Sequence, residues 1–290
     1  MASVISQTVI TAATVDPTRP RRYRSLDVAI IAVVVIIVLT AVIGAEVAPS
    51  SIFESHILSA LQGPSSQHLL GTDDQGRDVL WRVIAGCQVT LLSSAAIVAG
   101  YSVIGVVIAT LATMGARWID AMLMGFTDLT LALPGFVLAL GLAASLGPGL
   151  RSAIIAMIAA GWPLTTRMLR SVMRETMALP FVEGARVLGV SKTRLMIRHV
   201  LPNSLDVLIV KWAFDIGFTV IVLSGLSFLG VGPQPPSAEW GAMVAEAQSN
   251  ITTGWWAALA PGAAIAITAT AFGLLGDMLQ VRRNPELRQR

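Results

Sequence analysis

Long apolar runs separated by short polar segments dominate the pattern of hydrophobic and polar positions along the 290 residues. An α-helix needs about 20 apolar residues to cross the roughly 30 Å of a membrane's hydrocarbon core, and six runs approach or exceed that length. They cover approximately residues 28–45, 85–114, 117–146, 152–169, 205–231 and 257–279. The pattern predicts an all-α polytopic membrane protein with six transmembrane helices.

The first run follows a polar stretch that ends in a basic cluster, an order also found in secretory signal peptides. Its apolar part is longer than the ~7 to 15 residues of a signal peptide's hydrophobic region, and it lacks a clear small-x-small cleavage site. We interpret it as an uncleaved first span.

Composition agrees with a membrane protein. Hydrophobic residues make up 54% of the chain, charged residues 13%, and the mean hydropathy is +0.73. A soluble domain has about twice that share of charged residues. The net charge of +3 and the pI near 9.6 do not indicate nucleic-acid binding, because the positive charges lie in short segments between apolar runs, a pattern typical of membrane topology.

Lysine and arginine residues fall mainly on one side of the predicted membrane. Of the 20 in the chain, three lie on the other side (Arg77, Arg82 and Arg151), and Lys211 lies within a span. Loops rich in lysine and arginine stay in the cytoplasm. Both termini are therefore predicted to be cytoplasmic, in a multi-pass protein of the cytoplasmic membrane.

This topology divides the chain into four parts. We expect a cytoplasmic tail at 1–24, a first helix with an extracytoplasmic loop at 25–84, a core of five helices at 85–280, and a second tail at 281–290. Within the outer loop, residues 68–82 mix charged and apolar side chains at helical spacing, which predicts an amphipathic surface helix leading into the second span. Its charges could equally form only a solvated face.

One long basic, amphipathic stretch, residues 180–202, interrupts the apolar second half. Proline suits the first position of a helix, so Pro180 is predicted to open a short helix that Gly189 breaks. Ser191 is a plausible N-cap of a second short helix, which Pro202 is predicted to end. Two interpretations remain: a solvated loop that sets topology or binds anionic lipid headgroups, and a surface that docks into a partner's groove.

The chain has few residues that could catalyse a reaction or bind a nucleotide or a metal. A phosphate-binding loop of the form GxxxxGK[ST] is impossible, since the two lysines, Lys192 and Lys211, follow serine and valine. The histidines, His56, His68 and His199, are far apart and form neither a zinc motif nor a Ser-His-Asp arrangement. We expect no catalytic residues, no metal site and no cofactor bound by this chain, which therefore cannot hydrolyse a nucleotide itself.

Among the ionisable residues in or near predicted spans, Asp128, Lys211 and Asp215 are the candidates for a role in transport. Lys211 and Asp215 are four residues apart and share one helical face. Ionisable residues inside a membrane are costly and indicate either a transport path or an interhelical pair. Both interpretations stay open for these residues.

The basic stretch carries a recognisable motif. Glu183-Gly184-Ala185, Gly189 and Leu201-Pro202 resemble the EAA signature of permease subunits in bacterial ATP-binding-cassette (ABC) importers, EAA-x3-G-x9-I-x-LP. Gly184 stands where the first alanine is expected and His199 where isoleucine is expected. Further segments are similar to the C-type subunit of the dipeptide/oligopeptide permease family: GTDDQGRDVL (71–80), LPG (133–135), RHVLPN (198–203), GLSFLGVGPQPPSAEWG (225–241) and LLGD (274–277). The resemblance covers about residues 20–285.

This resemblance implies partners and roles. The partners would be a B-type permease, two ATPase subunits that hold ATP and magnesium, an extracytoplasmic binding protein, membrane lipid and a peptide substrate. A cytoplasmic loop at 175–203 would couple the spans to the ATPases through Glu183, Gly184, Ala185, Arg186, Gly189, Arg198, His199 and Pro202.

Three alternatives remain. The first is the same family with another cargo, such as a nickel chelate or glutathione. The second is an ion-gradient-driven secondary transporter that uses Asp128, Lys211 and Asp215 as a relay. The third is a membrane scaffold without a substrate path.

Overall fold

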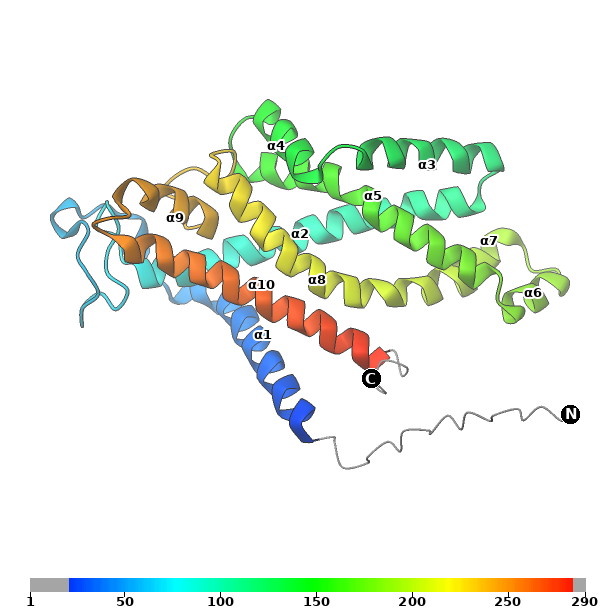
Figure 1. Ribbon diagram of the computed structural model, residues 1–290, viewed down its shortest axis with the longest axis horizontal. Helices are drawn as coiled ribbons and strands as arrows, with labels where there is room; N and C mark the ends of the chain where they lie inside the picture. The colour runs from blue at the N-terminus through cyan, green and yellow to red at the C-terminus, as the bar shows by residue number, and fades with distance from the viewer. Residues whose placement is uncertain (1–20, 284–290) are drawn as a thin grey trace, which may run out of the picture.

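Helices make up almost all of the computed structural model, which describes residues 21–283 (Figure 1). Within these residues the only β-type pairing is one bridge between Thr72 and Asp78. The long helices are α1 (Arg21–Val47), α2 (Val79–Met114), α5 (Leu150–Met177), α8 (Leu201–Phe228) and α10 (Trp255–Arg283). The shorter elements are α3 (Arg117–Leu131), α4 (Gly135–Leu146), α6 (Pro180–Val187), α7 (Lys192–Leu195), α9 (Trp240–Ala247), the 3-10 turns η1 (Ser50–Phe53), η2 (Ile57–Ser59) and η4 (Gln248–Asn250), and the π-helical turn η3 (Met196–Val200).

The long helices are each apolar enough to cross a membrane, and α3 and α4 reach that length only as a pair. The pair is bent by 86° at Pro134, which lacks a backbone N–H and keeps the residue before it out of helical geometry. The prediction of an all-α protein with apolar spans is thus confirmed. Its third span, predicted at residues 117–146, is present only as a broken one.

Helix α2 lies at the centre of the bundle and packs against α1, α5 and α8. Small residues bring α2 and α5 close together: a Cβ atom added at Gly105 would lie 2.9 Å from the Thr165 side chain, and one at Gly161 would lie 2.7 Å from the Tyr101 ring. Small residues are typical of interfaces between membrane helices, because they let the two backbones approach.

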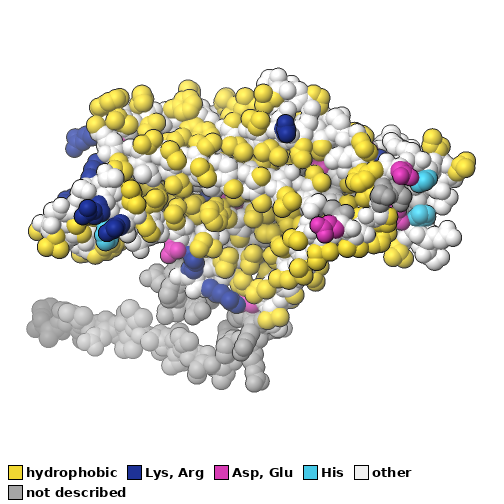
Figure 2. Space-filling model, turned by 180° about the vertical axis from the view of Figure 1, so that it is seen from behind, with side chains coloured by type: hydrophobic (Ala, Val, Ile, Leu, Met, Phe, Trp, Pro, Cys, Tyr) yellow, Lys and Arg dark blue, Asp and Glu magenta, His cyan; other side chains and the backbone are white. Residues whose placement is uncertain are grey.

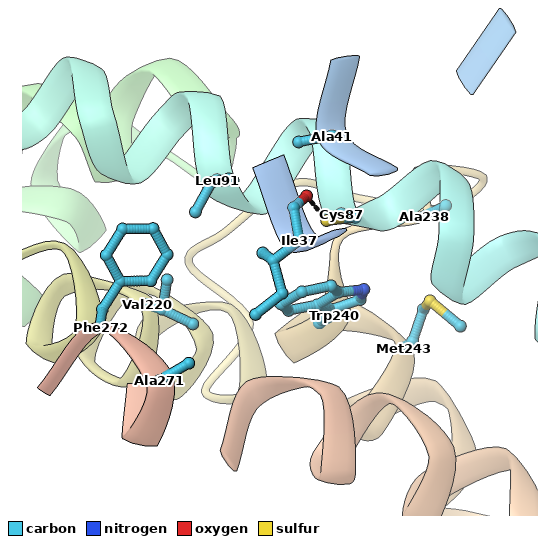
Figure 3. Packing of buried hydrophobic residues seen from close by; sticks show 10 residues of the cluster. All are labelled: Ile37, Ala41, Cys87, Leu91, Val220, Ala238, Trp240, Met243, Ala271 and Phe272. Carbon is cyan, nitrogen blue, oxygen red and sulfur yellow. Dashed lines mark hydrogen bonds between the residues drawn. The ribbon is translucent and has the colours of Figure 1, made fainter. Parts of the chain in front are cut away.

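A second packing centre joins α1, α2, α8, α9 and α10 around Trp240 (Figure 3). The indole N–H of Trp240 donates to the Val83 carbonyl at 2.9 Å. Cys87 is buried in the same cluster, with its thiol 3.5 Å from the Ile37 carbonyl oxygen. The one cysteine of the chain is therefore a packing residue.

The two ends of the bundle differ in what they carry. Figure 1 shows α6 and α7 at one end, which we call the inner end, and α9 with the loop 48–78 at the other, the outer end. Hydrophobic side chains cover most of the surface between them (Figure 2). The basic residues of α6, α7 and η3 place the inner end in the cytoplasm by the positive-inside rule.

The predicted tails lie mostly outside the described residues, which exclude 1–20 and 284–290. Helix α1 already begins at Arg21, inside the predicted tail 1–24, and α10 continues to Arg283.

The outer segment 68–82 is not the predicted surface helix. It forms a compact loop, and α2 begins only at Val79, with the Asp78 carboxylate accepting from the Trp81 N–H at 3.1 Å. Two glycines with positive φ, Gly71 and Gly76, turn the backbone where a helix would continue. The prediction fails because Asp73 and Arg77 of this loop, and Arg82 in the first turn of α2, are directed into the protein, while Asp74 stays exposed.

Candidate functional site

Helix α6 is held to the bundle by one side and exposed on the other. Val182 is fully buried and packs in a cluster with Leu169 and Met173 of α5 and Leu208 of α8. On the opposite side Val187 and Leu188 are 83% and 85% exposed. Helix α6 therefore has one face anchored to the bundle and one open apolar edge.

The end of α6 has a geometry that requires glycine at one position. Gly189 has φ +84°, its N–H donates to the Arg186 carbonyl at 3.0 Å, and the Val190 N–H donates to the Ala185 carbonyl at 3.2 Å. This pair of bonds is a Schellman motif with glycine in the left-handed conformation. The predicted helix break at Gly189 is confirmed. Gly184, by contrast, has open space where a Cβ would lie.

The second half of the basic stretch differs from the prediction. Ser191 occupies the N-cap position without a side-chain cap, and α7 runs through the π-helical turn η3 directly into α8. Pro202 does not end this helix but lies in the first turn of α8. The chain is helical on both sides of Pro202, and the wider π-helical turn η3 directly precedes it.

Most of the predicted coupling residues lie on the surface of the inner end. Glu183, Gly184, Arg186, Gly189, Arg198 and Pro202 are exposed. Ala185 is half-buried against the cluster of Val182, and the His199 ring is also half-buried, 6.5 Å from the Phe181 ring between centroids. Glu183 and Arg186 form no ion pair within residues 21–283.

Lys192 attaches this stretch to the bundle, because its ammonium donates to the Met114 carbonyl at the end of α2 at 2.6 Å. Cations near a helix C-terminus interact favourably with its free carbonyls. The inner ends of α2, α5 and α8 are therefore all connected to the segment that contains α6 and α7.

Lys211 and Asp215 form an ion pair on one face of α8, as their spacing indicates. Their side chains are only 13% and 16% exposed. The Lys211 ammonium also lies 5.4 Å from the centroid of the Tyr101 ring on α2, and the Trp212 indole N–H donates to the Ser102 hydroxyl at 3.0 Å. Both charges are thus compensated within the α2–α8 interface.

A second set of charges joins α3 to α5. The Asp120 carboxylate accepts from Arg170 at 2.5 and 2.7 Å and from Arg174 at 2.6 Å. Asp128, two turns further along α3, pairs with Arg167. The sequence indicated Asp128 but not its arginine partner. The available signal was spacing: Arg167, Arg170 and Arg174 share one face of a helix, as do Asp120 and Asp128.

The outer end contains a buried charge network that the sequence did not predict. Arg77 and Arg82 are each 1% exposed. Arg77 donates to Asp73 at 2.6 Å and to Glu246 of α9 at 2.7 Å, and Arg82 pairs with the same two carboxylates. Burial, followed by the adjacent Asp73 carboxylate, raises the pKa of Asp74 beside them. This network fastens the outer loop to α2 and α9.

Comparison with known proteins identifies the chain. Residues 101–289 match the family described as "binding-protein-dependent transport system inner membrane component". The chain belongs to this family. A putative peptide transport system permease of Brucella abortus biovar 1 is 36% identical over 273 residues, covering 93% of this chain and 90% of that protein. A dipeptide transport system permease of Alkalihalophilus pseudofirmus is 32% identical over 270 residues, covering 92% and 89%.

A glutathione transport system permease of Escherichia coli O6:K15:H31 is 34% identical over 273 residues, covering 92% of this chain and 89% of that protein. The methionine ABC transporter MetNI, solved in inward-facing conformations, matches with a TM-score of 0.58 at 16% identity, covering 70% of this chain and 97% of the matched chain. At that identity the likeness concerns the fold.

These matches confirm the predicted family and membrane location. The chain is a multi-pass permease subunit of an ABC importer. Such an importer also includes ATPase subunits and a substrate-binding protein.

Proposed function

We propose that this chain is the C-type permease of an ATP-driven importer of dipeptides and short oligopeptides. It forms one half of the translocation path, and a B-type permease forms the other. Two ATPase subunits bind ATP and magnesium and carry out hydrolysis, so this chain has no catalytic role and holds no cofactor. An extracytoplasmic binding protein delivers the peptide. The names of the relatives support the cargo class.

The observation that carries the proposal is the exposed edge of α6. We call the exposed side chains Phe181, Glu183, Arg186, Val187 and Leu188 the coupling surface. Large apolar side chains at a cytoplasmic end are costly in water, and an amphipathic helix that buries such an edge in a partner's groove removes that cost. Glu183 and Arg186 supply one charge of each sign for polar contacts around the apolar edge.

The packing of α6 gives this surface a mechanism. When the ATPases close on ATP, a docked α6 moves, and Val182 transmits that movement to the bundle because it packs in one cluster with residues of α5 and α8. The spans then switch between inward- and outward-facing states. The ATPases bias this two-state equilibrium through their different contacts in each state.

The test uses the complete importer in proteoliposomes with ATP inside and a labelled dipeptide outside. Glu183→Arg reverses a charge on the coupling surface and is expected to reduce ATP-dependent uptake at least about tenfold, equivalent to a loss of roughly 1.4 kcal/mol. It should also reduce co-purification of the ATPases. Glu54→Arg makes the same charge change at an exposed position of the outer end and should leave ATPase retention unchanged.

If the Glu183→Arg importer takes up peptide and retains its ATPases as the wild type does, the coupling role is contradicted. Uptake that continues with inactive ATPases would instead favour the gradient-driven alternative. Competition by glutathione, whose transporters include a 34% identical relative, separates that cargo from dipeptides.

A further inference from the structure

The Asp128–Arg167 pair is unusual in being both deep and exposed. Asp128 lies eleven residues beyond the start of α3, and Arg167 lies ten residues before the inner end of α5. At 1.5 Å per residue each lies about 15 Å along its helix from the inner end. Yet their side chains are 54% and 58% exposed.

Lys211–Asp215 provides the comparison at similar depth. Lys211 is ten residues beyond the start of α8, but that pair is covered by α2 and Tyr101. Charged side chains within a membrane face the interior of a bundle or a water-filled cavity, since contact with lipid is costly. A pair this exposed on one subunit is therefore expected to face a water-filled cavity or a neighbouring subunit rather than lipid.

Aromatic and apolar side chains lie around the pair. Phe126 stacks on Trp162 at 5.7 Å between ring centroids, and Leu129 and Leu164 are at least 60% exposed nearby on α3 and α5. Binding sites for small molecules are typically apolar walls with a few placed polar groups. Here the polar groups are one carboxylate and one guanidinium.

Both members of the pair have unused bonding capacity. One Arg167 nitrogen, Nη2, bonds to one Asp128 oxygen, Oδ1, so the other guanidinium N–H groups and Oδ2 have no hydrogen bond in the described part of the chain. A guanidinium can bind a carboxylate through two parallel N–H bonds. Asp120, by contrast, already accepts from both Arg170 and Arg174.

We propose that Asp128 and Arg167 form a binding site on the translocation path for the charged ends of a peptide. The α-carboxylate binds Arg167, the α-ammonium binds Asp128, and the Asp128–Arg167 bond opens. One ion pair is replaced by two, and the net charge of the site with its zwitterionic ligand stays zero. The proposal rests on the peptide cargo proposed above.

The first experiment pairs each residue with one end of the substrate. The complete importer takes up a free dipeptide or the same dipeptide amidated at its C-terminus. The measured quantity is the ratio of free-dipeptide uptake to amidated-dipeptide uptake. Arg167→Gln is expected to reduce this ratio at least about fivefold relative to wild type. Any preference of the binding protein is common to both importers and cancels in this comparison. Asp128→Asn with an N-acetylated dipeptide tests the other end in the same way.

Two variants make the result specific. Arg167→Lys retains the cation and should retain most of the preference. Arg174→Gln removes an exposed arginine of the same helix that is bound to Asp120, and the ratio should stay at its wild-type value. If Arg167→Gln lowers uptake of both peptides by the same factor, Arg167 has only a structural role and the proposal is wrong.

A second experiment does not depend on the cargo. Asp128→Cys is made together with Cys87→Ala, which removes the chain's native cysteine, and the importer is treated from the inner side with a charged, membrane-impermeant thiol reagent. Modification is expected because the position faces water. Absence of modification would overturn the proposal. If the wild-type importer takes up no peptide at all, the proposed cargo is wrong. The labelling experiment would still decide whether the pair lies on the path.

Discussion

At the outer end Arg77 and Arg82 are almost completely buried and bond to Asp73 and Glu246. At the inner end Glu183 is exposed and has no ion-pair partner among the described residues. Both ends carry charges near the connections between spans. The outer charges hold the chain's own elements together, whereas Glu183 and Arg186 at the inner end are available to another subunit.

Glycines show the same difference. A Cβ atom at Gly76 would lie 1.9 Å from the His56 carbonyl oxygen, so the outer loop packs closely around that position. At Gly184 and Gly189 a Cβ would meet no atom within 4 Å. Internal packing therefore accounts for the outer residues. At the inner end only the positive φ of Gly189 is explained by the fold of this chain.

The largest expected effect is on the outer network. Arg82→Ala leaves Asp73 and Glu246 buried with one cation fewer, and breaking a buried ion pair in this way costs about 3–5 kcal/mol. We expect a loss of that size in the free energy of unfolding, measured by denaturant titration in detergent. Arg194→Ala at the exposed inner end should change it by less than about 0.5 kcal/mol. Equal effects of the two substitutions would remove the distinction between the ends.

Two glycine substitutions, one at each end, should change the free energy of unfolding by smaller amounts and in opposite directions. Gly76→Ala places a side chain at φ +76° against the His56 carbonyl, so we expect destabilisation of at least about 2 kcal/mol. Gly184→Ala lies inside α6 with free space, so it should stabilise the helix by up to about 1 kcal/mol. The same denaturant titration measures both changes. Stabilisation by Gly76→Ala would show that the outer loop rearranges freely.

The sequence predicted the features that depend on local pattern. Apolar runs located the spans, and a glycine between two short helical segments located the end of α6. Contacts between segments far apart in the sequence are not predictable in this way. Glu246 is 169 residues from Arg77, so the local pattern gives no sign of their ion pair. From that pattern alone, the charges of 68–82 indicate a surface helix. Arg167 was missed for the same reason, because its partner Asp128 is on another helix.

The smallest expected effect concerns Glu239, the N-cap of α9 near the outer end. Its side chain is fully buried and accepts from the Ala242 N–H at 2.9 Å, and burial raises its pKa above the ordinary value of 4.5. The folded state therefore binds a proton more tightly than the unfolded state. This contribution to stability is complete below about pH 4.5 and is lost as the pH rises through the folded-state pKa.

Glu239→Gln keeps an oxygen acceptor for the cap and removes the titration. We expect it to flatten the decline of unfolding free energy with pH above 4.5, measured by denaturant titrations at a series of pH values. If Glu239→Gln keeps the wild-type dependence of stability on pH, burial of this carboxylate does not contribute to that dependence, and the contrast between the ends does not extend to protonation.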